Sequence, residues 1–277
     1  MPAKSQQLRL LSTSTIAPPT FKQVRLVELW CAEPVFFASR EISDCYYTEG
    51  VLGNYALAYA LDWVSSPYRL VGQATGRPTY LEDLVPIAQD SYILPAWAPE
   101  GRVTFRFERF NALSDAYWYS MTNNRVATAR EDLPEYRRLQ KAKGQDKPRH
   151  RSFSASNFPQ TGRLRMIDRG NVFHTLVFGG QELPEYFRIG KFRSKVRLSV
   201  LQEFELVSLP PGEYTSQALL NTADLPPDLE LLVFDLISIP PVSLIKNVRF
   251  RGSAWQIGEF ILPANLQFCG GRITSGT

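Results

Sequence analysis

The chain has 277 residues, 44% of them hydrophobic and 12% aromatic, which is a globular composition and excludes a disordered protein. A net charge of +4 defines no partner, but residues 125–169 alone hold twelve Lys/Arg against five Asp/Glu, a concentration that favours a polyanion partner. The sequence has no apolar leader, no run of eighteen apolar residues and only three widely spaced cysteines. We therefore expect no secretion, no membrane span and no disulfide framework. The expected location is the reducing cytoplasm.

The N-terminal part predicts a lead-in, a strand and a helix. Residues 1–21 are polar and end at two prolines, so they predict a flexible lead-in before the domain. Residues 24–30 are apolar enough for a central strand. Thr48 is a suitable N-cap, and the apolar stripe that follows it predicts a helix ending near Trp63.

The middle of the chain predicts an excursion, a strand and a basic insertion. Residues 64–101 are rich in proline and turn residues, whereas residues 102–110 alternate strictly between apolar and polar and predict a strand. Residues 130–162 predict a flexible basic arm. Its seven cations within fifteen residues are Arg137, Arg138, Lys141, Lys143, Lys147, Arg149 and Arg151.

The C-terminal half predicts mostly strands. Residues 164–167 and 172–178 are expected to pair around a turn at 168–171. The later elements are a strand at 190–198, a segment at 204–209, a short helix at 216–221, and strands at 229–239, 248–250 and 255–262. We therefore expect an α+β fold with a mostly antiparallel sheet, forming one domain over residues 22–265 with a C-terminal tail at 266–277.

The segment 190–198 carries the clearest functional signal. Its cations alternate with apolar residues, and successive side chains on a strand point to opposite faces. A strand would therefore hold in one row Lys191, Arg193, Lys195 and Arg197. Such a row repels itself unless an anion or solvent covers it, and a nucleic-acid backbone has the matching repeat. The alternative is a solvated face whose cations meet glutamates on a neighbouring strand.

Aromatic residues near these cations are candidates for stacking on unpaired bases. Phe153 and Phe158 accompany the arm, Tyr186, Phe187 and Phe192 accompany the strand, and residues 117–119 (Tyr-Trp-Tyr) precede Asn123, Asn124 and Arg125. The alternative for Phe187 and Phe192 is a place in the core.

Catalytic and metal motifs are absent from the sequence. The two histidines, His150 and His174, have no metal-ligand spacing beside them, and the chain has no phosphate-cradling glycine loop and no nucleophile elbow. No metal or cofactor is expected. A metal-independent ribonuclease remains an alternative, with His174, Lys191 or Lys195, and Tyr186 as its proton-transfer group.

Four segments together resemble a known family. Residues 36–41 (FFASRE), 47–49 (YTE), 52–61 (LGNYALAYAL) and 188–195 (RIGKFRSK) are similar, in this order, to the Cas-five-type subunit (Csc-one) of type I-D CRISPR Cascade complexes, within the RAMP superfamily. The likeness spans roughly residues 24–260, and its specific parts are the N-terminal helix motif and the segment 188–195.

The resemblance implies a ferredoxin-like (RRM-like) βαββαβ core with large insertions and a non-catalytic role. It implies partners: the 5′ handle of the CRISPR RNA, target double-stranded DNA at the PAM, a large Cas-ten-type subunit and the backbone RAMP subunits. On this basis the RNA-binding residues are Arg188, Lys191, Arg193, Ser194, Lys195, Arg197, Arg40 and Tyr47. The DNA-binding residues are Asn123, Asn124, Arg125 and the seven cations of the arm. A basic scaffold that docks acidic proteins is the remaining alternative.

Overall fold

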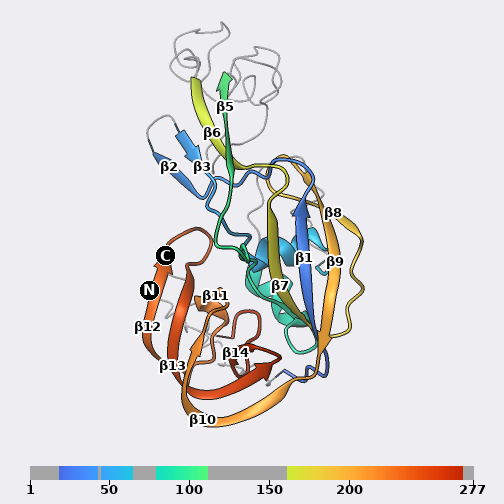
Figure 1. The fold of residues 1–277 in the computed structure, drawn as a ribbon, viewed down its shortest axis with the longest axis vertical. Coiled ribbons are helices and arrows are strands. Elements are labelled where there is room, and N and C mark those ends of the chain that lie inside the picture. Colours follow the sequence, from blue (N-terminus) through green and yellow to red (C-terminus); the bar gives the residue numbers. More distant parts are fainter. Residues whose placement is uncertain (1–18, 43–44, 65–78, 112–160, 271–277) are drawn as a thin grey trace, which may run out of the picture.

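The structure is a computed structural model, and it describes residues 19–42, 45–64, 79–111 and 161–270. These residues form three sheets with little helix (Figure 1). Most of the expected lead-in and nearly all of the expected basic insertion lie outside the described residues. The sheets are largely antiparallel, as the sequence predicts, and one parallel pair joins β3 to β6.

The main sheet has five strands in the order β4-β7-β1-β9-β8, and all its neighbours are antiparallel. The strands are β4 (Tyr92–Ile93), β7 (Val172–Phe178), β1 (Val24–Cys31), β9 (Ser194–Phe204) and β8 (Tyr186–Ile189). The central position predicted for the strand at 24–30 is confirmed, because β1 pairs on both sides. Its side chains Val27, Leu29 and Cys31 are fully buried.

One face of the main sheet is covered by α1 (Asn54–Ala60), which contributes Tyr55, Leu57 and Ala58 to the core. The helix starts six residues later than Thr48. The Thr48 hydroxyl donates to the Phe37 carbonyl (2.8 Å) and accepts from the Phe37 N–H (3.0 Å), so it ties two extended segments together and caps no helix. A second helix, α2 (Tyr80–Leu84), is followed by a 3-10 helix (Val85–Ile87).

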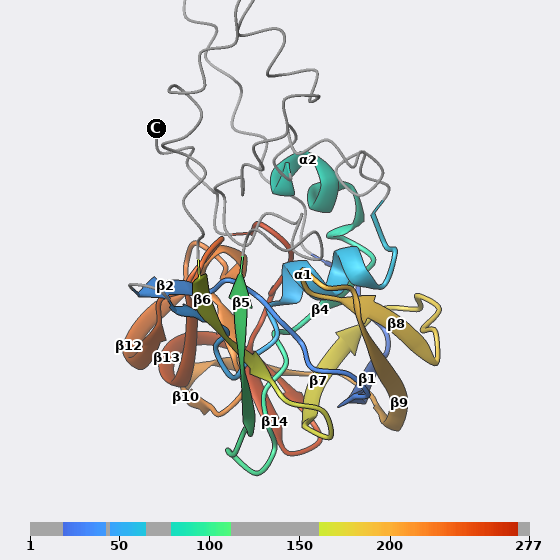
Figure 2. The same cartoon turned by 90° about the horizontal axis from the view of Figure 1, so that it is seen from above.

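The C-terminal sheet is built around the long strand β13 (Leu244–Ile257), which merges two of the strands expected from the sequence. Its partners are β10 (Val207–Ser216), β11 (Leu220–Asn221), β12 (Glu230–Ile237) and β14 (Phe260–Pro263). Figure 2 separates this sheet from the strands β7, β1, β9 and β8. The two sheets meet through Phe178 and Trp255, whose rings lie 6.0 Å apart.

The helix expected at 216–221 is wrong. Strand β10 runs to Ser216, and β11 is followed by a 3-10 helix (Thr222–Asp224). The Asn221 side chain accepts from the Ala223 N–H (2.9 Å), which caps this turn. The apolar run 218–220 is buried as extended chain, and a short buried run has no period that separates helix from strand.

The C-terminal segment belongs to the core, so the predicted boundary at 265 is too early. Leu266, Phe268 and Cys269 are almost completely buried. The Cys269 N–H donates to the carboxylate of Asp224 (2.9 Å), which also accepts from Tyr55, Asn54 and Tyr92. This buried network joins the C-terminal segment to α1 and β4.

A third sheet projects beyond the main one (Figure 1). This projecting sheet has the order β2-β3-β6-β5, from strands β2 (Arg40–Ile42), β3 (Cys45–Tyr47), β6 (Thr161–Ile167) and β5 (Phe105–Asn111). The strand predicted at 102–110 is confirmed in its second half. Strands β6 and β7 exist as expected, but they do not pair with each other, because they belong to different sheets.

Asn171 explains why the expected hairpin does not close. Its side chain accepts from the Thr104 N–H (2.8 Å) and donates to the Thr104 and Asp168 carbonyls (3.0 and 2.7 Å). These bonds turn the chain from the projecting sheet into the main sheet. The second helix of a βαββαβ core is also missing, because residues 179–193 between β7 and β9 contain β8 and turns. None of the helices in the described ranges is long and apolar enough to cross a membrane.

Candidate nucleic-acid interface

The basic run at 190–198 is a turn followed by the start of β9, so the single row of four cations is wrong. Residues 190–193 form the turn of the β8–β9 hairpin. Gly190 has φ +78° and Arg193 has φ +55°. Both values lie in the left-handed region, which a strand does not use. Only Lys195 and Arg197 share one face of β9 as predicted.

Two residues of the turn and the first residue of β9 anchor the hairpin to the protein. Phe192 stacks on the buried Phe36, with ring centroids 5.1 Å apart and an interplanar angle of 20°. The Lys191 N–H donates to the Phe36 carbonyl (2.9 Å), and burial lowers the pKa of the Lys191 side chain. Ser194 is 3% exposed, and its hydroxyl donates to the Pro34 carbonyl (2.6 Å). The core alternative for Phe192 therefore has support, and the Ser194 hydroxyl is already engaged.

The exposed face of β8, β9 and β1 brings cations and aromatic rings together. Arg188 lies opposite Lys195, and Tyr186 lies opposite Arg197. On the other side of β9, Trp30 lies opposite Arg197. Directly opposed residues in an antiparallel pair share a face. We call this surface the cation face; it consists of Trp30, Tyr186, Arg188, Lys195 and Arg197.

Each ring on the cation face carries one cation. The Lys195 ammonium lies 4.0 Å from the centroid of the Tyr186 ring, and the Arg197 guanidinium lies 5.3 Å from that of Trp30. The rings remain accessible, with Tyr186 42% and Trp30 37% exposed. Such contacts hold the charges in place. Trp30 and Tyr186 are separated by more than 150 residues, so sequence alone does not join them.

Two carboxylates lie at the cation face: Glu28, two residues before Trp30 on the same face of β1, and Glu33. Glu33 accepts from the Lys195 backbone N–H (2.7 Å) and lies 3.7 Å from the Arg188 guanidinium. Arg188 also donates to the Arg193 carbonyl (2.8 Å). Glu33 therefore offsets part of the Arg188 charge, although Arg188 is not one of the four cations of the predicted row.

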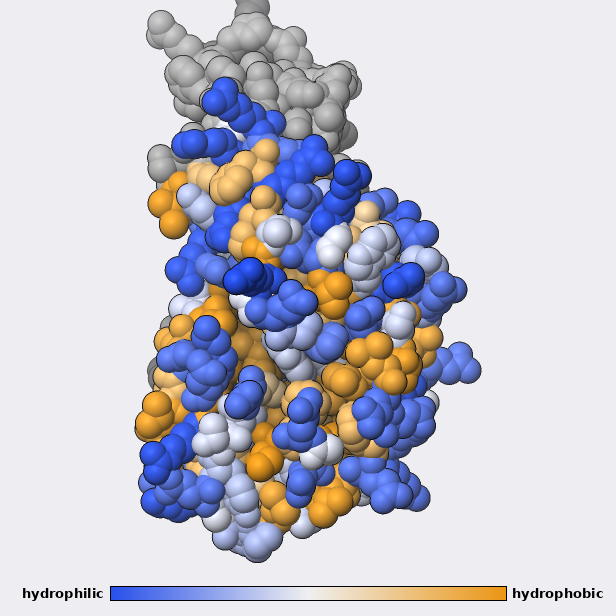
Figure 3. Space-filling view, in the orientation of Figure 1, coloured by the Kyte–Doolittle hydropathy of each residue, from blue (hydrophilic) through white to orange (hydrophobic). Residues whose placement is uncertain are grey.

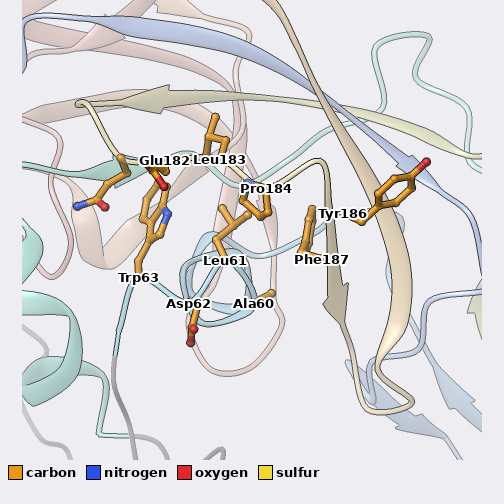
Figure 4. A pocket seen from close by; sticks show the side chains of 10 residues that line it. Ala60, Leu61, Asp62, Trp63, Glu182, Leu183, Pro184, Tyr186 and Phe187 are labelled. Carbon is orange, nitrogen blue, oxygen red and sulfur yellow. The ribbon is translucent and has the colours of Figure 1, made fainter.

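A hollow of about 650 Å³ adjoins the edge of β8 (Figure 4). It lies between the end of α1 and the segment leading into β8, and Figure 4 shows the Tyr186 ring pointing away from the other labelled side chains. Among the described residues, its lining includes the carboxylates of Asp62 and Glu182 and no lysine or arginine. Two carboxylates repel phosphate, so the hollow does not extend the cation face.

The other predicted site residues lie elsewhere. Arg40 and Tyr47 are on the projecting sheet, where Arg40 pairs with Glu49 (2.9 Å). All the residues assigned to DNA, from Asn123 to Arg151, lie outside the described residues. Sequence reasoning missed Arg109, Arg163 and Arg165, although Arg163 and Arg165 alternate with Leu164 and Met166 in β6 much as the cations at 190–198 do.

The proton-transfer group of the ribonuclease alternative is not assembled. His174 lies on β7 beside Glu28, whose carboxylate is 3.9 Å from Nε2. Two strand spacings and four residues along β9 separate it from Lys195, about 16 Å in total. The described residues also contain no group of three His, Cys, Asp or Glu side chains able to hold a metal ion.

Largely antiparallel sheets with an accessible face of cations and aromatic rings define a β-rich protein. The chain belongs to the family described as Type I-D CRISPR-associated protein Cas5/Csc1, which matches residues 22–271. It is thus a CRISPR effector subunit of type I-D. No curated protein matches it.

Two solved structures are similar at low identity. A chain in the cryo-EM structure of the Type III-B Cmr-beta bound to cognate target RNA and AMPPnP is 10% identical, with a TM-score of 0.41 over 82% of this chain and 86% of that one. A crystal structure of a CRISPR protein from Archaeoglobus fulgidus is also 10% identical, with a TM-score of 0.37 over 88% of this chain and 99% of that one. Likeness at this level defines neither the fold nor the function here.

Proposed function

We propose that this protein is a non-catalytic subunit that binds the 5′ handle of the CRISPR RNA with its cation face. The observation that carries the proposal is the alternation of Arg188, Lys195 and Arg197 with two accessible aromatic rings on one sheet face. Cations bind the phosphates and fix the path of the strand, and the rings accept unpaired bases. Single-stranded RNA offers both partners at once.

The proposal extends to the core and the partners. Strands β9, β1, β7 and β4, with α1 joining β1 to β4, correspond to a ferredoxin-like core in which β8 replaces the second helix. As a Cas5/Csc1 member, the subunit would contact the large Cas-ten-type subunit and the first backbone subunit in the cytoplasm. The segment from Asn123 to Arg151 would hold target duplex DNA near the PAM.

Handle binding is tested with the purified full chain and a labelled handle RNA. The double variant Lys195→Ala/Arg197→Ala should bind more weakly, and its plot of log K against log salt should be shallower by about 1.4, because each phosphate contact on a single strand contributes about −0.7. Lys22→Ala/Lys246→Ala is the matched control, since it removes two exposed cations elsewhere. Equal affinity and slope in the two double variants would overturn the proposal.

The ribonuclease alternative has its own test. Repeat RNA is incubated with the protein in a chelating buffer, and products are resolved by length. The non-catalytic role predicts intact RNA. Site-specific cleavage that disappears in His174→Ala would reject that role, although His174 and Lys195 lie far apart in the structure.

A further inference from the structure

The projecting sheet has a face built almost entirely from arginine, aromatic and apolar side chains. Register places them in two rows across the four strands. The first row is Arg40, Tyr47, Arg165 and Phe107, and the second is Ile42, Cys45, Arg163 and Arg109. Phe105 lies beyond the first row on the same face. We call this surface the arginine face.

The arginine face carries four arginines, of which Arg40 pairs with Glu49 (2.9 Å). Within the described parts of β2, β3, β5 and β6, no aspartate or glutamate occupies a position on this face. Arg109 and Arg163 lie directly opposite each other, and both side chains are exposed. A sheet that keeps two opposed arginines on a solvent-facing side is suited to an anionic ligand.

Aromatic and apolar side chains on the same face are unusually accessible. Phe107 is 61% exposed and Ile42 is 57% exposed. The Arg165 guanidinium stacks on Phe105, 3.5 Å from the ring centroid, and lies 5.7 Å from that of Tyr47. Figure 3 shows strongly hydrophilic side chains gathered around apolar ones at this end of the molecule. The surface therefore offers flat stacking positions between guanidinium groups.

The opposite face of the projecting sheet is different. Leu164 and Met166 are buried there against Phe36, and Phe192 packs on the same cluster. Arg106 on that side pairs with Glu108 (2.9 Å). The turn that carries the cation face into β9 thus lies against one side of this sheet, and the arginine face occupies the other. The two cationic surfaces are separate.

We propose that the arginine face is a second binding surface, for an unpaired polynucleotide strand. Arginines bind the phosphates, and unpaired bases stack on Phe107, because every base has an aromatic face. In a duplex these faces are covered by the neighbouring bases. An acidic protein would satisfy the charges but has no need of the exposed ring. The inference goes beyond handle binding, since it adds a path on the other side of the projecting sheet.

The test uses the full chain carrying Lys195→Ala/Arg197→Ala, so that the cation face contributes little. Labelled oligo-U RNA, oligo-dT DNA and a DNA duplex of equal length are titrated by fluorescence anisotropy. Adding Arg109→Gln/Arg163→Gln should weaken single-strand binding and reduce its salt slope by about 1.4. Adding Phe107→Leu should weaken it at least about fivefold with an unchanged slope, the lower limit for losing one stacked base.

Arg106→Gln is the matched control, because it removes one arginine from the same strand on the other side. The proposal would be overturned if the arginine pair variant and Phe107→Leu both bound single strands with the same affinity as this control. Loss with the arginine pair while Phe107→Leu is neutral would also overturn it, and would favour an acidic protein as the ligand. Stronger binding of RNA than DNA assigns the surface to the guide strand, and the reverse assigns it to a DNA strand freed from its duplex. If the unmodified chain does not bind the handle RNA, the proposed function fails, but the result of this test of the arginine face still stands.

Discussion

A Cβ atom on Gly190 would lie 2.7 Å from the carbonyl oxygen of Phe36. The hairpin that carries the cation face therefore approaches the segment 35–37 as closely as a glycine allows. The same carbonyl accepts the Lys191 N–H, so the contact is both a close approach and a hydrogen bond.

Replacing this glycine should loosen the hairpin. Gly190→Ala adds the clash to a φ of +78° that alanine disfavours, so the free energy of unfolding should fall by more than about 1 kcal/mol. Chemical denaturation measures the change. Gly180→Ala is the control, since its Cβ meets nothing within 4 Å, and it should stay within about 0.5 kcal/mol of the parent. Equal stabilities would contradict the observed packing.

Asp224 should make stability depend on pH. Burial raises the pKa of its carboxyl from 3.8 to about 6, although its hydrogen bonds act in the other direction. The folded state therefore holds the proton more tightly than the unfolded state. The contribution is fully present below pH 3.8 and is lost as the pH rises through about 6.

The measurement compares unfolding free energies of the parent and Asp224→Asn across pH 4 to 7. The parent should lose stability relative to the variant between about pH 4 and 6, because only the parent releases this proton. Above pH 7 the difference should be constant. A difference that is the same at every pH would show that Asp224 does not titrate in this range.

Tyr55 should support the Asp224 carboxylate. Its hydroxyl donates to Asp224 Oδ1 (2.7 Å) and lies 3.5 Å from the Cys269 sulfur. Tyr55→Phe removes a donor from a buried charge, so stability at pH 7 should fall by about 1–3 kcal/mol and the Asp224 pKa should rise further. Tyr214→Phe is a suitable control, because its hydroxyl bond to the Pro210 carbonyl is at the surface. Similar losses in both variants would argue against the buried network.

Arg109→Glu should stabilise the fold while it weakens binding of single strands. The new carboxylate lies opposite Arg163 and replaces a like-charge pair by an opposite one, a gain of about 0.2–1 kcal/mol. Arg106→Glu should do the reverse, because it breaks the pair with Glu108. Thermal unfolding separates the two. A loss of stability in Arg109→Glu would show that the two arginines do not repel each other.

The sequence predicted the strands better than their partners. The positions of β1, β7 and β12 follow from apolar runs, and their existence is confirmed. The alternation at 190–198 does not distinguish a strand from a turn entering one, because Gly190 and Phe192 take their roles from contacts with Phe36. A local sequence pattern does not predict such contacts between distant segments.

The candidate site was predicted in part for the same reason. Lys195 and Arg197 share a face as the alternation requires, and register adds Arg188. Trp30 joins them only because β1 pairs with β9. The arginines of β6 alternate with apolar residues just as clearly, but Arg109 of β5 joins them only because it lies opposite Arg163, which requires the strand pairing.

The bonds of Asn171 have a mechanical consequence. They join Thr104, just before β5, to Asp168, just after β6, so these two of the four strands of the projecting sheet are held together at its base. A projecting sheet that is held in this way does not rotate relative to the main sheet. A strand docking on it meets a surface already in its final orientation, and little freedom has to be given up on contact. Asn171 directly precedes β7, so it connects the base of the projecting sheet to the strand beside the central strand β1.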